Sequence, residues 1–174
     1  MNVNLRKNIL TALLIAIGVI LRQIVPGTIG SMKFDVMLSV VFVALLINRD
    51  FKNTILTGLL GGLIAAMTTT FPGGQLPNII DKLITCCMVY GMIQLSEKFQ
   101  NQTVARGIIS FVGTIISGTI FLTSALFIVG LPAPLEVLFL GIVLPTAVTN
   151  IFLTTFLYQT VLMAMKVTGI QIAD

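Results

Sequence analysis

Long apolar runs alternate with short polar connections along the whole chain. A hydrocarbon core of about 30 Å needs roughly 20 helical residues. Six apolar segments are candidates, at residues 8–25, 36–48, 54–71, 79–96, 107–129 and 137–165. We therefore expect an all-α integral membrane protein in which residues 1–174 form one membrane domain, a bundle of six transmembrane helices.

The composition supports a membrane location. Hydrophobic residues make up 56% of the chain and charged residues only 9%, whereas a soluble domain carries about 25% charge. The first apolar segment contains Arg22 and is not followed by a small-residue cleavage pattern. We therefore interpret it as a retained helix and not as a signal peptide.

The basic residues are distributed unequally between the two ends of the predicted helices. An even number of spans places both termini on one side of the membrane. The connections on that side carry Arg6, Lys7, Arg49, Lys52, Lys98, Arg106 and Lys166, whereas the other side has only Arg22, Lys33 and Lys82. Because cytoplasmic loops are enriched in Lys and Arg, both termini are predicted to be cytoplasmic, with the other loops facing outward.

Several functional classes are disfavoured by what the sequence lacks. The sequence has no basic cluster with interleaved aromatic residues, which is the pattern that would indicate nucleic-acid binding. Cys86 and Cys87 are neighbours in an apolar run, a spacing that fits neither a metal site nor an ordinary disulfide. The chain has no histidine and no nucleotide-binding glycine loop. We expect no cofactor or metal, no enzymatic activity, and ATP hydrolysis only by partner subunits.

The most polar internal stretch is Phe71–Lys82, between two long apolar segments. Asn78 followed by Asp81 predicts an N-cap with a capping-box partner and a helix that begins near Ile79. On that helix Asn78, Asp81, Lys82 and Thr85 share one face, which is a candidate binding surface. The alternative is that Asp81 only caps the helix and Lys82 extends toward the lipid headgroups.

The second apolar segment is unusually short. Residues 36–48 number only 13, which gives about 20 Å of helix and leaves some 10 Å of the membrane uncrossed. Lys33 and Asp35, which precede it, are therefore expected to dip below the outer surface and face a protein cavity. A locally thinner bilayer is the alternative explanation.

Two further features concern helix packing. Ala12 and Ala16 are four residues apart and form a flat groove that suits a close helix contact, either with a partner protein or within the bundle. Pro145 is expected to interrupt the last helix, and a polar stripe that includes Asn150 follows it. Asn150 at that depth suits either a ligand contact or helix-to-helix hydrogen bonding.

Three stretches give the chain a resemblance to a known family: residues 32–35 (Met-Lys-Phe-Asp), residues 69–82, and residues 143–145 (Val-Leu-Pro) with Asn150. The chain resembles the bacterial tryptophan-transport family, whose members are substrate-binding S components of energy-coupling factor (ECF) transporters. The resemblance implies a six-helix bundle in the bacterial cell membrane, tryptophan as substrate, and a partner module of one transmembrane T component and two ATPases. It also implies that Ala12 and Ala16 dock on the T component, although the family form has a further alanine where Thr11 stands.

The outer half of the chain offers the chemistry that a zwitterionic aromatic amino acid requires. Such a ligand needs a cation, an anion and an apolar slot. Asp81 is the preferred ammonium partner, Lys33 or Lys82 the carboxylate partner, and Phe121 a further wall. The predicted substrate-binding set is Lys33, Asp35, Phe71, Gln75, Asn78, Asp81, Lys82 and Asn150. The alternative function is a solitary ion-coupled carrier with the same cavity, although no internal repeat of the kind common in such carriers is evident.

Overall fold

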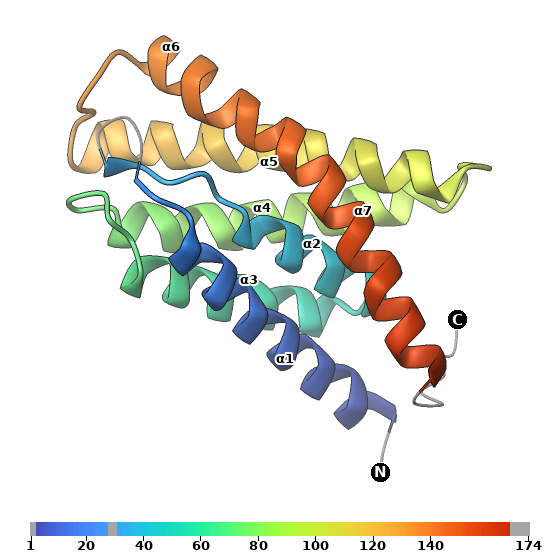
Figure 1. Cartoon of the computed structure of the whole chain (residues 1–174). Coiled ribbons are helices and arrows are strands. Elements are labelled where there is room, and N and C mark those ends of the chain that lie inside the picture. The colour runs from blue at the N-terminus through green and yellow to red at the C-terminus, as the bar shows by residue number, and fades with distance from the viewer. Residues whose placement is uncertain (1–2, 28–30, 168–174) are drawn as a thin grey trace.

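A computed structural model describes residues 3–27 and 31–167 of the chain, and helices dominate this part. The helices, shown in Figure 1, are α1 (Val3–Ile24), α2 (Met37–Ile47), α3 (Phe51–Met67), α4 (Gln75–Ser96), α5 (Gln102–Ile128), and a last run of α6 (Leu135–Leu138), a π-helical turn η2 (Phe139–Val143) and α7 (Leu144–Val167). Counting the last run once gives six apolar helical segments, which confirms the predicted number.

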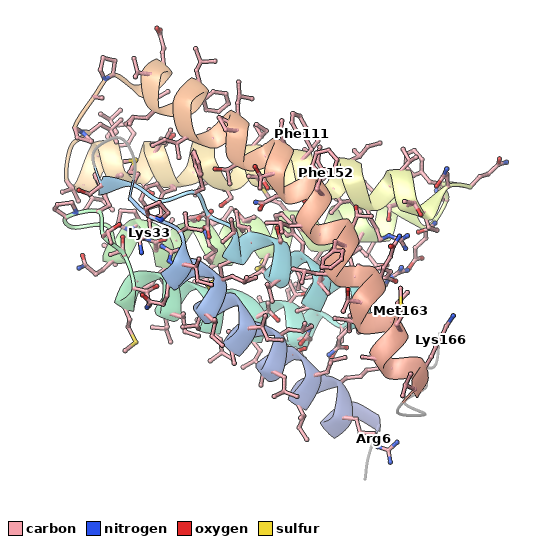
Figure 2. All side chains as sticks on the ribbon, viewed as in Figure 1. Arg6, Lys33, Phe111, Phe152, Met163 and Lys166 are labelled. Atoms are coloured by element: carbon pink, nitrogen blue, oxygen red, sulfur yellow. The ribbon has the colours of Figure 1, made fainter. Side chains whose placement is uncertain are left out.

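Four of the helical segments in the described part are long and apolar enough to cross a membrane, and α2 and α3 are shorter apolar helices. The beginning of α1 and the end of α7 lie at the same end of the bundle (Figure 1). Figure 2 shows Arg6 and Lys166 at that end and Lys33 toward the opposite end. Which end faces the cytoplasm stays a prediction.

Helix α2 lies in the middle of the bundle. Its sequence contains a single polar residue, Ser39, and a helix that is apolar on all sides is stable only when it is buried on all sides. All eleven of its residues are buried, and it contacts α1, α3, α4, α5 and α7. Because other helices cover it, α2 does not need the length of a membrane span, which accounts for the short segment seen in the sequence.

Glycines allow α3 and α4 to approach each other closely. A Cβ atom at Gly62 would lie 3.1 Å from the Ile79 Cα, and one at Gly58 would lie 3.3 Å from the Lys82 carbonyl oxygen. Side chains at these two positions would push α4 away from α3. The close packing fixes the position of α4, and with it the charged residues that α4 carries.

The predicted start of α4 is wrong. The helix begins at Gln75, with Gly74 at the N-cap position, so Asn78 and Asp81 lie inside the helix and do not form a capping box. Pro77 falls in the first helical turn, where a residue without an N–H is tolerated because no intrahelical acceptor is available there. Gly73, at φ +73°, makes the turn before the helix, a conformation that glycine adopts without steric cost.

The last helical run is interrupted next to Pro145, as expected from the sequence. Residues 139–143 form a π-helical turn directly before Pro145, and the Leu144 N–H donates to the Phe139 carbonyl, five residues back. Pro145 has no N–H to continue the α-helical pattern. After the proline, the Thr146 hydroxyl donates to the Ile142 carbonyl of its own helical run at 2.6 Å.

Candidate functional site

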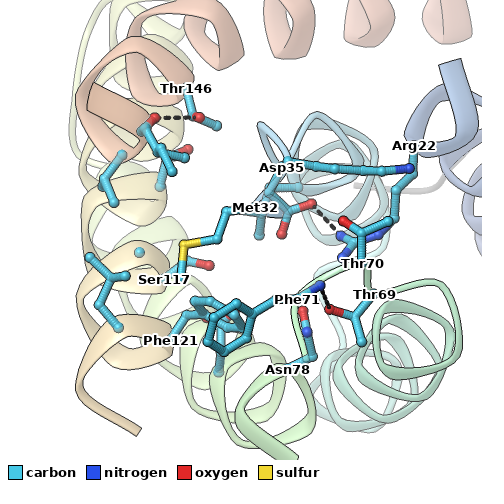
Figure 3. A pocket seen from close by; sticks show the side chains of 18 residues that line it. Arg22, Met32, Asp35, Thr69, Thr70, Phe71, Asn78, Ser117, Phe121 and Thr146 are labelled. Carbon is cyan, nitrogen blue, oxygen red and sulfur yellow. Dashed lines mark hydrogen bonds and ion pairs between the residues drawn. The ribbon is translucent and has the colours of Figure 1, made fainter. Parts of the chain in front are cut away.

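A cavity lies between the C-terminal end of α1, the connection before α2, and parts of α4, α5 and the last helical run. It is partly open to the outside and is lined by both polar and apolar side chains, the combination that is typical of small-molecule sites. Figure 3 shows the side chains that surround this space. The composition of its lining makes this cavity the candidate ligand site.

One wall of the cavity is aromatic and apolar. The Phe71 and Phe121 rings meet edge to face, with centroids 5.9 Å apart and an interplanar angle of 70°, and Met32 lies near them (Figure 3). At Gly118 a Cβ atom would overlap the Val143 side chain. The absence of a side chain there allows the last helical run to come close to α5 beside the cavity.

Four charged side chains form a connected cluster beside this wall. The Arg22 guanidinium pairs with Asp35 at 3.1 Å, and the Lys82 ammonium pairs with Asp35 at 2.6 Å and also with Asp81. Lys82 donates further to the Ser117 hydroxyl at 3.4 Å. Since an ammonium has three donors, the described partners of Lys82 account for all of them.

The cluster is electrically neutral as a whole, with two cations and two carboxylates. Lys82 and Asp81 are each only 1% exposed, and buried charges are tolerated when they are paired and hydrogen-bonded. Asp35 lies in the connection before α2. Burial raises the pKa of its carboxyl, but the neighbouring Lys82 and Arg22 outweigh burial and hold the pKa below its ordinary value. Asp35 is therefore ionised at neutral pH.

Lys33 differs from the other cations of the cavity. It is half-buried and lines the cavity, but within residues 3–27 and 31–167 its ammonium forms no ion pair or hydrogen bond. The neutral cluster together with Lys33 gives the cavity a net charge of about +1 at pH 7. An anionic group of a ligand is the natural complement of that charge.

The structure brings together five of the eight residues predicted to bind substrate. Lining the cavity are Lys33, Asp35, Phe71, Asn78 and Asp81. Gln75 is exposed at the start of α4 and lies outside the lining. Lys82 lies behind the lining, where it supports both carboxylates. These placements leave the binding role of each residue a prediction.

Asn150 serves the helix packing and also lies outside the cavity lining. Its Nδ2 donates to the Asp35 carbonyl and to the Thr114 hydroxyl, both at 3.1 Å, and its Oδ1 accepts from the Ser39 hydroxyl at 2.7 Å. The side chain thus ties α7 to α5 and to the beginning of α2. Of the two roles open from the sequence, the structure supports helix-to-helix hydrogen bonding.

Arg22 was not among the residues predicted to form the site. Its side chain is buried, lines the cavity and pairs with Asp35. The signal in the sequence was a charge within an apolar helix, which by itself indicates a functional position. The charge pattern of the sequence places Arg22 among the outer cations but does not assign it to the cavity.

The face of α1 that points away from the bundle is apolar. Ala12 and Ala16 are both exposed, and Leu13, Ile17 and Ile20 beside them are between 45% and 62% exposed. Thr11 points inward instead, where its hydroxyl contacts the Asn53 side-chain oxygen at 2.9 Å. Thr11 is therefore on the buried side of α1, whereas the two alanines are on its exposed side.

Comparisons with known proteins show that the chain is similar to tryptophan-transport proteins. A family model described as "Tryptophan transporter TrpP" matches residues 4–166. A protein of Clostridium acetobutylicum named "Probable tryptophan transport protein" is 44% identical over 167 residues, which cover 96% of this chain and 98% of that protein. A protein of Bacillus subtilis with the same name is 41% identical over 156 residues, 90% of each chain. No solved structure gives a significant match.

The ion-pair cluster predicts a stability effect at Lys82. Replacing Lys82 by Met leaves the Asp81 carboxylate buried beside Asp35 without its cation, and breaking a buried ion pair in this way costs about 3–5 kcal/mol. We expect Lys82→Met to unfold at a clearly lower temperature than the wild-type chain in detergent. Lys52→Met, at an exposed position at the start of α3, is the control and should melt like the wild type. Equal melting of both variants would mean that the cluster contributes little to stability.

Proposed function

Because the chain belongs to the tryptophan transporter TrpP family, we propose that it is the substrate-binding membrane subunit of an importer that takes up tryptophan. The family assignment agrees with a multi-pass protein of the bacterial cell membrane that is a transporter and not an enzyme. The observation that carries the proposal is the cavity itself, in which an aromatic wall faces a charged lining.

We assign each part of tryptophan to a different part of the cavity lining. The indole would lie against Phe71 and Phe121, since aromatic pairs contribute about 0.5–1.5 kcal/mol beyond the burial of area. Asn78 uses its Nδ2 to donate to the Gly74 carbonyl at 2.7 Å, which leaves its Oδ1 as an acceptor for the indole N–H. The head group would lie near Lys33 and the carboxylates of Asp35 and Asp81.

We further propose that the chain works as an S component and depends on an ECF module of one T component and two ATPases. Two observations support this. The sequence contains no nucleotide-binding loop, so the energy of ATP would have to come from other subunits. The exposed alanine face of α1 suits a close helix contact, and Thr11 does not obstruct it because it points inward.

We propose an orientation in the membrane from the distribution of basic residues. Seven of the ten Lys and Arg residues belong to the end of the bundle that carries the termini, and the positive-inside rule predicts that this end is cytoplasmic. The cavity would then open outward, capped by the loops before α2 and α4. This is the orientation that an uptake protein needs in order to capture substrate from outside.

The orientation can be tested by labelling single cysteines in cells. In a background with Cys86 and Cys87 replaced by serine, Pro132→Cys between α5 and α6 should react with a membrane-impermeant maleimide added from outside. Gln100→Cys, between α4 and α5, should react only after the cells are permeabilised. The reverse labelling pattern would place the cavity on the cytoplasmic side and rule out capture of external substrate.

The proposed docking face predicts a separation of binding from transport. Replacing Ala12 or Ala16 by Leu adds bulk to the interface, and overpacking typically costs about 1–3 kcal/mol. We therefore expect each variant to lower uptake by about tenfold or more while tryptophan binding to the purified chain is unchanged. Gly91→Leu is a matched control, because Gly91 is exposed on α4 and a Cβ there meets no atom within 4 Å.

Two results would contradict the partner role of α1. One is that the T component still co-purifies with both alanine variants and uptake stays at the control level. The other is that the chain alone, reconstituted in vesicles without ATPases, accumulates tryptophan at the rate seen in cells. The second result would instead support the solitary ion-coupled carrier.

A further inference from the structure

We propose that the cavity recognises its ligand through the carboxylate and gains little from the ammonium group, so that it also accepts aromatic carboxylic acids without an amine. The inference rests on the proposed function, because it concerns the same cavity and the same indole slot. It assigns recognition of the head group to one residue, Lys33, and adds aromatic carboxylic acids without an amine to the ligands that the cavity accepts.

The first observation is that both carboxylates of the cavity are already paired. Asp35 contacts Arg22 through Oδ1 and Lys82 through Oδ2. Asp81 contacts Lys82 through Oδ2, and its Oδ1 accepts from the Thr85 hydroxyl at 2.9 Å. A ligand ammonium would have to share these oxygens with protein cations that carry the same charge as itself. Each such cation within a few ångströms weakens the attraction for the ammonium.

The second observation is the uncompensated charge of Lys33. Its ammonium has no ionic partner among the described residues, whereas the other four charges of the site balance one another. A zwitterion such as tryptophan leaves the net charge of the cavity unchanged at about +1, while a monoanion neutralises it. The electrostatic balance of the site therefore favours a ligand with a carboxylate and no amine.

The third observation is that the aromatic slot does not depend on the amine. Phe71, Phe121 and Met32 line one wall of the cavity, and Lys33 lines the same cavity from the connection before α2. Because both groups line one cavity, we assign the ring of the ligand to the aromatic wall and its carboxylate to Lys33. 3-Indolepropionic acid is tryptophan without its amine and retains both contacts, whereas tryptamine retains the ring and the amine but has lost the carboxylate.

Calorimetric titration of the purified full chain with these three compounds tests the inference. We expect 3-indolepropionic acid to bind within about tenfold of tryptophan, and tryptamine to bind about a hundredfold more weakly or not at all. Lys33→Met should weaken tryptophan and 3-indolepropionic acid by about tenfold or more, and should not weaken tryptamine. Lys33→Arg keeps the charge and should restore most of the affinity.

Controls separate a loss of recognition from a loss of folding. Lys98→Met removes an exposed cation after α4 and should bind all three compounds like the wild type. A Lys33→Met protein that elutes and melts like the wild type but binds tryptophan weakly supports the direct role of Lys33. If the folded variant binds tryptophan and 3-indolepropionic acid with unchanged affinity, Lys33 is not the carboxylate partner and the inference is wrong.

The results also distinguish this inference from the proposed function. If tryptophan binds but 3-indolepropionic acid does not, the ammonium is required and only the inference fails. If 3-indolepropionic acid binds and tryptophan does not, carboxylate recognition holds and tryptophan is the wrong substrate. If neither compound binds, both statements fail.

Discussion

The arrangement of this bundle depends on a lysine that has been removed from both water and lipid. An unpaired ammonium in a low-dielectric interior is strongly unfavourable, so Lys82 requires partners at fixed places. Those partners come from the connection before α2, from α4 itself and from α5. Arg22 extends the same cluster to α1 through Asp35. One set of charges thereby links four parts of the chain around the cavity.

The buried helix α2 is what makes room for that cluster. Because α2 has only eleven residues, Asp35 lies in the interior at the point where α2 begins, and Asn150 holds the backbone there through the Asp35 carbonyl. The space next to the short helix is the cavity. The burial of the charges and the position of the cavity therefore both depend on the short, buried helix α2.

Much of this could be read from the sequence, and the failures have physical causes. Apolar runs gave the six helices, and the short second segment correctly drew attention to Lys33 and Asp35. The predicted start of α4 is wrong because Asn78 and Asp81 match a capping pattern by spacing alone, whereas the helix begins before Pro77, and a proline in the first turn is compatible with a helix. The roles of Lys82 and Asn150 depend on which side chains meet them from distant parts of the chain, and a single sequence does not contain that information. Arg22 could have been found, since a charge in an apolar helix requires a partner.

The central claim is that this cavity holds tryptophan, and the most direct measurement is to titrate the purified chain, without any partner, with each of the twenty amino acids. The proposed function predicts saturable one-to-one binding of tryptophan at the cavity that is lined by the aromatic wall and Lys33. Phenylalanine and tyrosine, which lack the indole, should bind at least about tenfold more weakly. Tighter binding of any other amino acid, or no binding of tryptophan by the folded chain, would contradict the account.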